Sequence, residues 1–250
     1  MIPFFTALRF LTVIPISWRA ERDGELFKQS IYYFSLIGLL IGSCGWLLVS
    51  ALGFILPNSC VAFFALFYLS AISGFLHLDG LADSGDGLLS YRPKDASLNI
   101  MKDSRTGAMG VVVLMMVLLG KYSSLSSLPV STIALAVFFM PLAGRTAILV
   151  TMAANNYARP EGGLGGLFYS SRSLKAALAG CLLLFVVATF VAGLKYAAVV
   201  VCCMLFTVLI FSLFCRKRIG GVTGDTLGAM CELTELAIAL AVVVMFTING

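Results

Sequence analysis

The chain has 250 residues, of which 60% are hydrophobic and only 12% are charged, and its mean hydropathy is +1.01. A soluble domain carries about twice this share of charged residues, so the composition excludes an ordinary soluble protein and indicates an integral membrane protein. The formal net charge of +5 is not gathered into a basic face or a recognition motif. Nucleic acid is therefore not an expected partner, whereas a lipid bilayer is.

The first stretch, MIPFFTALRFLTVIPI, predicts an N-terminal interfacial helix. Pro3 and Pro15 flank it, Arg9 interrupts it and no small-residue cleavage site follows, so the stretch differs from a signal peptide. Its apolar residues recur at helical spacing, as in a helix that lies at the headgroup boundary.

Seven apolar runs follow, and each is long enough to cross a bilayer as a helix, which takes about 20 residues. The alternating ten-residue segments of an outer-membrane barrel are not seen, so the expected fold is all-α, a polytopic bundle of about seven spanning helices. No repeat or linker divides the sequence, which predicts a single domain over residues 1–250. The runs lie near residues 31–56, 59–78, 107–128, 130–153, 174–193, 196–214 and 227–247.

The basic residues predict how the chain is oriented. Fourteen of the 17 lysines and arginines fall on one side of these spans, while Lys121 and Lys195 fall on the other and Arg145 lies within a span. By the positive-inside rule the richer side is cytoplasmic, so the N-terminus is expected inside and the C-terminus outside a bacterial cytoplasmic (inner) membrane. The seven cysteines show no C-x-x-C spacing, which indicates neither a disulfide framework nor a zinc site.

The segment FLHLDGLADSGDGLLS, residues 75–90, carries the only histidine, His77, and three aspartates. If the helix of the second span continues past Leu78, then Asp79, Asp83 and Asp86 share one stripe at positions i, i+4 and i+7. Three carboxylates on one stripe repel one another unless a cation lies between them, and Mg²⁺ prefers oxygen ligands. A helix end solvated by aspartates is the alternative interpretation.

Glycines within this segment weaken the predicted helix, so a break near Gly85 is expected. A second acidic segment, GGVTGDTLGAMCELTE at residues 220–235, places Asp225, Glu232 and Glu235 on one further stripe. We expect both stripes to point to the cytoplasmic side. For the two glutamates, packing inside the bundle in protonated or hydrogen-bonded form is the alternative.

The segment MKDSRTGAMG, residues 101–110, supplies Lys102, Asp103 and Arg105 just before the third span. Arginine offers a planar fork that binds phosphate oxygens in pairs, and lysine offers a point charge. The segment is therefore a candidate pyrophosphate-binding loop, and ordinary positive-inside charge is the alternative.

Two further arginines are candidate substrate-binding residues. Arg145 lies midway along the fourth span, and a buried arginine of this kind usually faces a polar cavity or an acidic partner; Asp79, Asp83 or Glu232 is the expected partner. Arg159 lies in the glycine-rich loop NNYARPEGGLGG. Acids for a metal, basic residues for phosphate and one histidine suit a transfer between phosphate-bearing substrates.

Three of these segments, FLHLDGLADSGDGL, MKDSRTGAMG and GGVTGDTLGAMCELTEL, together resemble the cobalamin synthase family, the adenosylcobinamide-GDP ribazoletransferases. The opening ALRFLTVIPI and the NNYARPEGGLG loop are also similar to that family's pattern, so the likeness covers nearly the whole chain in order. The N-terminal motif of the family usually has arginine at the position where this chain has Val13. This difference puts in doubt only a functional role of the side chain at position 13.

The resemblance implies a late step of cobalamin synthesis. The hydroxyl of α-ribazole, or of its 5′-phosphate, would attack the cobinamide-linked phosphorus of adenosylcobinamide-GDP and release GMP, with Mg²⁺ as cofactor. Asp79, Asp83 and Asp86 would hold the metal, Asp225 and Glu232 would be further ligands or orienting groups, and Arg105 above all would bind the pyrophosphate.

His77 is the candidate base for the ribose hydroxyl, because its ordinary pKa of about 6.5 suits proton transfer near neutrality; a structural role that orients an aspartate is the alternative.

Two other functions stay open from the residues alone. A CDP-alcohol phosphotransferase also uses magnesium aspartates, but it normally contains D-G-x-x-A-R, and Asp83 stands in the place of that arginine. A cation or substrate transporter would use Asp79, Glu232 and Arg145 along its path, yet no acid is predicted on the outer side. Assembly into a homo-oligomer is left open by the sequence.

Overall fold

The computed structural model describes residues 2–16, 23–159, 162, 164–170 and 172–249. Throughout this part the fold is helical, with one isolated bridge between Tyr157 and Val222 and no strand, which confirms the all-α prediction. Arg19 and Arg22, two of the basic residues used to orient the chain, lie outside the described residues.

Six helical segments of the described chain are long and apolar enough to cross a membrane, and they confirm six of the seven predicted spans. The first runs from Glu25 to Leu52 through α2 (Asp23–Ser30), η1 (Ile31–Tyr33) and α3 (Phe34–Leu52). The protein is thus a multi-pass membrane protein. The other five segments are α7 (Ala108–Ser126), α8 (Val130–Ala154), α9 (Ser173–Ala192), α10 (Leu194–Ile219) and α11 (Gly224–Asn249).

The second predicted span is broken into two helices, α4 (Asn58–Ile72) and α5 (Leu76–Leu89), which meet at 88°. The bend lies at Gly74 and Phe75, with φ angles of +60° and +59°. This left-handed conformation is easy for glycine and uncommon for phenylalanine. The prediction that the helix of the second span continues past Leu78 is therefore wrong, because that helix ends at Ile72. A separate helix carries the aspartates, and it runs through Gly85 without the expected break.

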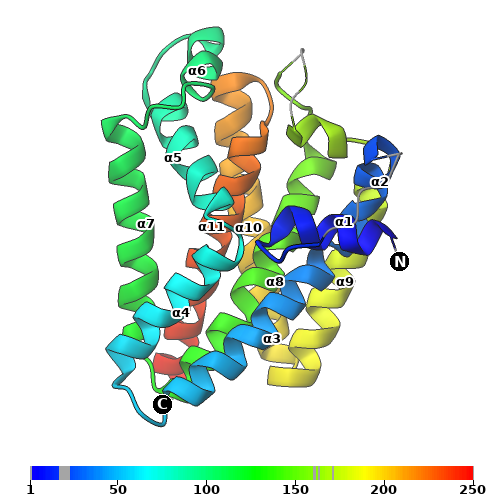
Figure 1. Cartoon of the computed structure of the whole chain (residues 1–250). Helices are drawn as coiled ribbons and strands as arrows, with labels where there is room; N and C mark the ends of the chain where they lie inside the picture. The colour runs from blue at the N-terminus through cyan, green and yellow to red at the C-terminus, as the bar shows by residue number, and fades with distance from the viewer. Residues whose placement is uncertain (1, 17–22, 160–161, 163, 171, 250) are drawn as a thin grey trace.

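Helix α8 forms the centre of the bundle, because 83% of its most apolar stretch is buried, against 28–44% for the other spanning segments. Helix α3 lies alongside it (Figure 1). At this crossing a Cβ built on Gly38 would lie 2.5 Å from the carbonyl oxygen of Pro141, and one built on Gly42 would meet the carbonyl of Phe138. Small residues of this kind let membrane helices approach closely.

The remaining elements lie around this core. Helix α1 (Ile2–Leu11) lies crosswise to the long helices in Figure 1, and α6 (Lys94–Ile100) caps the end of the bundle that α5 approaches with its C-terminus. The short helix η2 (Leu164–Phe168) packs against α2 and α11. Helix formation at the N-terminus agrees with the sequence, and the interfacial position of α1 stays a prediction.

Candidate functional site

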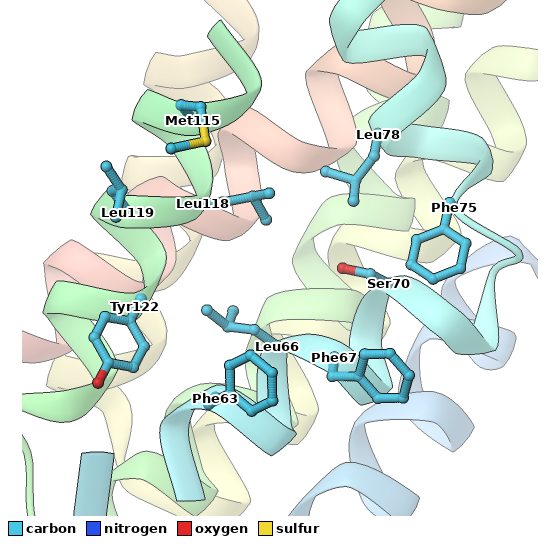
Figure 2. Close-up of a pocket in the computed structure, with 10 residues that line it drawn as sticks. All are labelled: Phe63, Leu66, Phe67, Ser70, Phe75, Leu78, Met115, Leu118, Leu119 and Tyr122. Carbon is cyan, nitrogen blue, oxygen red and sulfur yellow. The ribbon is translucent and has the colours of Figure 1, made fainter. Parts of the chain in front are cut away.

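An apolar groove lies between α4, α5 and α7, with a volume of about 330 Å³, larger than a second cavity beside α5 (Figure 2). Apart from the hydroxyls of Ser70 and Tyr122, its lining is hydrocarbon and sulfur, and Phe63, Phe67 and Met115 are more than half exposed. No charged side chain lines this groove. It therefore offers no group for phosphate or acid–base chemistry.

The smaller cavity, of about 130 Å³, brings polar and aromatic residues together between α1, α3, α5, α8, η2 and α11. His77 and Asp79 of α5 and Asp225 of α11 line it. Three residues predicted as site residues from two distant segments thus share one cavity. The apolar part of its lining includes Phe10, Leu11, Phe34, Ile148, Met152 and Phe168.

The aromatic residues of this wall contact one another directly. The ring of Phe168 lies 4.7 Å from that of Phe10 and 5.4 Å from that of Phe34, measured between centroids. Both distances fall in the favourable range for aromatic pairs. The cavity lining therefore combines a cluster of tilted and edge-on aromatic rings with acidic residues.

Glycines allow α5 and α11 to approach closely at the acidic side. A Cβ built on Gly80 would lie 2.7 Å from the backbone oxygen of Asp225, and one built on Gly228 would lie 3.3 Å from the Cα of His77. A side chain at position 80 would force α5 or α11 to shift. The close backbone contact that glycine permits there therefore fixes the position of Asp225 relative to Asp79.

We expect Gly80→Ala to lower turnover about a hundredfold, because a displacement of about 1 Å at a reacting site costs that much. The added methyl would push α11, and Asp225 with it, away from α5. Steady-state kinetics of purified protein measure this loss. Gly120→Ala is the matched control, since the nearest atom there is the flexible Leu236 side chain at 3.0 Å. Equal losses in both variants would contradict this role of Gly80.

The acidic side extends from the cavity toward the end of α5. Asp83 is half-buried and interacts electrostatically with Asp79, Asp225, Asp86 and Arg159. Arg159 donates from Nη2 to Oδ2 of Asp225 at 2.6 Å, and its Nε is buried with no hydrogen-bond partner. Arg159, predicted as a substrate-binding residue, thus lies beside the aspartates and keeps one N–H donor, Nε–H, without a partner.

Asp86 has structural partners at the start of α7. Its Oδ2 accepts a hydrogen bond from the backbone N–H of Gly107 at 2.7 Å, and its Oδ1 accepts one from Gly110 at 2.8 Å. Backbone N–H groups at the start of a helix have no acceptor within the helix. The geometry therefore gives Asp86 the role of capping α7, and its role as a metal ligand stays a prediction.

Replacement of Asp86 by Ala is expected to destabilise the protein by about 1 kcal/mol, the usual cost of a lost helix cap. Hydrogen exchange at Gly107 and Gly110 should rise in this variant, because both amides lose their acceptor. Asp86→Asn is the matched control, since its amide oxygen still accepts one hydrogen bond. Unchanged exchange at both amides in Asp86→Ala would contradict the capping role.

The basic loop before α7 is not part of the cavity lining. Arg105 is 87% exposed and binds both carboxylate oxygens of Asp103, with Nη2–Oδ2 at 2.6 Å. Hydrogen bonds from Arg105 lower the pKa of Asp103 to about 2, so the pair is fully charged near neutrality. Lys102 is exposed on the same loop. Asp103 occupies the Nε and Nη2 donors of Arg105, so a phosphate would bind the remaining N–H groups or displace Asp103.

Three predicted site residues, His77, Arg145 and Glu232, belong to a buried charge network between α5, α7, α8 and α11. Lys121 Nζ lies 2.6 Å from Glu232 and 2.7 Å from Glu235, and Arg145 Nη1 lies 2.5 Å from Glu235. Arg145 Nη2 lies 3.4 Å from Nδ1 of His77. All five side chains are at least 94% buried. The network thus reaches from Glu232 to His77, which lines the cavity.

This network changes three expectations. The acidic partner of Arg145 is Glu235, where Asp79, Asp83 or Glu232 was expected, because Gly144 brings α8 against α11 beside Glu235. Glu232 pairs with Lys121 and does not line the cavity. Lys121 itself, counted as an outward loop residue, is buried in α7. A cation and two acids inside predicted spans were the signal that could have revealed this pairing.

The carboxylates of α5 and α11 are the candidate ligands of the expected Mg²⁺. Within the described ranges, no three His, Cys, Asp or Glu side chains stand close enough to enclose an ion by themselves, so Asp79, Asp83, Asp86, Asp225 and Glu232 do not form one ligand set. Mg²⁺ is commonly held by one or two carboxylates plus substrate phosphates. Asp79 and Asp83, one helical turn apart, fit a site of that kind.

Comparison with known proteins gives a consistent result. The family model described as cobalamin-5-phosphate synthase matches residues 3–243. Similar proteins named adenosylcobinamide-GDP ribazoletransferase include one from Clostridium botulinum (32% identical, 97% of each chain), one from Clostridium tetani (31%, 98% of each) and one from Acetivibrio thermocellus (34%, covering 90% of this chain and 91% of that one). No solved structure matches the chain.

Proposed function

The chain belongs to the cobalamin-5-phosphate synthase family and is a transferase of a late step in cobalamin synthesis, and we propose that the cavity between α5 and α11 is where it joins its two substrates. Those substrates are adenosylcobinamide-GDP and α-ribazole or α-ribazole 5′-phosphate. The family assignment sets aside the CDP-alcohol phosphotransferase and the transporter.

The observation that carries this proposal is the make-up of the smaller cavity. One cavity is lined both by His77, Asp79 and Asp225 and by phenylalanines of α1, α3 and η2. A nucleoside acceptor needs both kinds of surface, because its base is a flat aromatic ring and its ribose hydroxyls are polar. Aromatic side chains bind such rings by offset or edge contacts. The ribose hydroxyl would then lie toward the carboxylates.

In the proposed reaction a ribose hydroxyl oxygen of the acceptor forms a bond to the cobinamide-linked phosphorus. The bond from that phosphorus to the bridging oxygen breaks, and GMP leaves with the electron pair. The proton of the attacking hydroxyl is released to water, which balances the step, and catalysis of such transfers is mostly positioning and electrostatic stabilisation. The chain's main task is then to position both substrates and stabilise charge.

Asp79 and Asp83 would hold Mg²⁺ together with the diphosphate oxygens of the donor. The bound ion supplies positive charge that neutralises the diphosphate and stabilises the leaving GMP. Arg159 would contribute its unpartnered Nε–H to a phosphate oxygen while Asp225 holds the other end of its guanidinium. A charge-assisted hydrogen bond of this type is about twice as strong as a neutral one.

The experiment that tests this function uses purified protein in detergent with adenosylcobinamide-GDP, Mg²⁺ and α-ribazole or its phosphate. We expect one GMP for each corrinoid that gains a ribazole, and almost no GMP when the acceptor is omitted. GMP release that does not depend on the acceptor would indicate a hydrolase and contradict the proposal, as would the absence of any corrinoid product.

We also propose that the acidic ends of α5 and α11 face the cytoplasm in a bacterial inner membrane. The support is the excess of lysine and arginine on that side and the positive-inside rule. Asp95→Cys, at an exposed position of α6, can be tested in a background without the seven native cysteines. An impermeant thiol reagent should label it in inverted vesicles; labelling only in right-side-out vesicles would reverse the orientation.

A further inference from the structure

We infer that His77 acts as a hydrogen-bond donor through its Nε2–H, held in that form by the buried charge network, and not as the base that the sequence predicted. The inference rests on the proposed function for its catalytic meaning, although the state of the ring can be measured without substrate. It also assigns Arg145 and Glu235 as positioning residues, which act on the reaction through His77.

The tautomer follows from the partner of the ring. Nη2 of Arg145 lies 3.4 Å from Nδ1 of His77, and a guanidinium has only N–H donors. Nδ1 must therefore accept, and a neutral ring that accepts at Nδ1 carries its proton on Nε2. Since Nδ1 is turned toward α8, the Nε2 edge is the one left for the cavity that His77 lines.

The network keeps Arg145 in place to impose this tautomer. Glu235 binds Arg145 through Oε1 and Lys121 through Oε2, and Lys121 also binds Glu232. Two cations and two carboxylates give the group no net charge, so no member is left as an uncompensated buried ion. Glu235 and Lys121 thus hold the guanidinium of Arg145 beside Nδ1 of His77, where it can only donate.

A neutral ring with its proton on Nε2 has no lone pair facing the cavity, so it cannot accept the ribose proton there. It can donate a hydrogen bond to a phosphate oxygen as charge develops in the transition state. Donors fixed in advance in this way are among the largest contributions to catalysis, and removing one typically costs about a hundredfold to a thousandfold in turnover.

The experiment uses the fact that His77 is the only histidine of the chain. Protein labelled with ¹⁵N-histidine and purified through a tag without histidine gives the two ring nitrogen signals of this residue alone. We expect a neutral ring with the proton on Nε2. A ring protonated on Nδ1 alone, or on both nitrogens, at neutral pH would overturn the inference, and neither result depends on turnover.

Kinetics then test the donor role. We expect His77→Ala to lower kcat about a hundredfold, whereas His77→Gln should stay within about tenfold of the native enzyme, because its amide places an N–H near the position of Nε2 but cannot act as a base. Equal inactivity of both variants in folded protein would overturn the donor role, and so would full turnover of His77→Ala. If the native enzyme makes no product, the proposed function fails while the NMR result still stands.

Discussion

Asp83→Asn is expected to lower acceptor-dependent GMP release about a thousandfold while the protein stays folded. Asp83 lies one turn after Asp79 on α5, half-buried, and interacts electrostatically with Asp79, Asp225 and Arg159. An amide of the same shape keeps the packing but removes one negative charge from the proposed metal site. Loss of several kcal/mol of metal-assisted stabilisation corresponds to about this factor, at 1.36 kcal/mol per tenfold.

The matched control for this prediction is Asp95→Asn. Asp95 is an exposed aspartate of α6, so the same chemical change there should leave turnover within about twofold. Raising Mg²⁺ should restore part of the activity of Asp83→Asn, because the weakened site still has Asp79 and the substrate phosphates. Activity of Asp83→Asn equal to that of Asp95→Asn would show that the carboxylate of Asp83 takes no part in the reaction.

Lys121→Met is expected to destabilise the protein by about 3 to 5 kcal/mol. Removing one partner of a buried ion pair leaves its counterions without compensation, and Lys121 is the direct partner of two glutamates, Glu232 and Glu235. Thermal unfolding of the purified protein in detergent measures the loss. The midpoint should fall clearly below that of the native protein.

Two variants make this prediction specific. Lys175→Met changes an exposed lysine at the start of α9 and should leave the unfolding midpoint unchanged. The double variant Lys121→Met with Glu232→Gln removes one charge of each sign, so it should regain part of the lost stability. If the double variant is as unstable as Lys121→Met, or if Lys121→Met unfolds like the native protein, the network does not stabilise the fold as described.

Much of the fold could be predicted from hydropathy, because a spanning helix needs a long apolar run and such runs are visible in the sequence. The prediction failed at 59–78, where the apolar run continues while the backbone turns by 88°. Gly74 and Phe75 both adopt a positive φ there. Glycine is a local sign of such a bend, but phenylalanine rarely takes this conformation, so the sequence around Phe75 did not indicate the break.

The candidate site was predictable only in part, for a related reason. Helical spacing correctly grouped Asp79 with Asp83, and acids of both segments do approach each other at Asp225. Spacing along one helix does not reveal which neighbour a carboxylate meets, so it gave no sign that Asp86 caps α7 or that Glu232 pairs with Lys121. The aromatic wall was also missed, because Phe10, Phe34 and Phe168 come from three distant elements.

The central claim is that a divalent ion joins the carboxylates of α5 to the diphosphate of the donor. Substitution of Mg²⁺ by Mn²⁺, with electron–nuclear double resonance on the complex with adenosylcobinamide-GDP, tests it most directly. We predict a ³¹P coupling to Mn²⁺ on the native enzyme that is lost in Asp79→Asn with Asp83→Asn, at Mn²⁺ concentrations where Asp95→Asn retains it. Absence of ³¹P coupling in the native complex, or equal coupling without both aspartates, would contradict the claim.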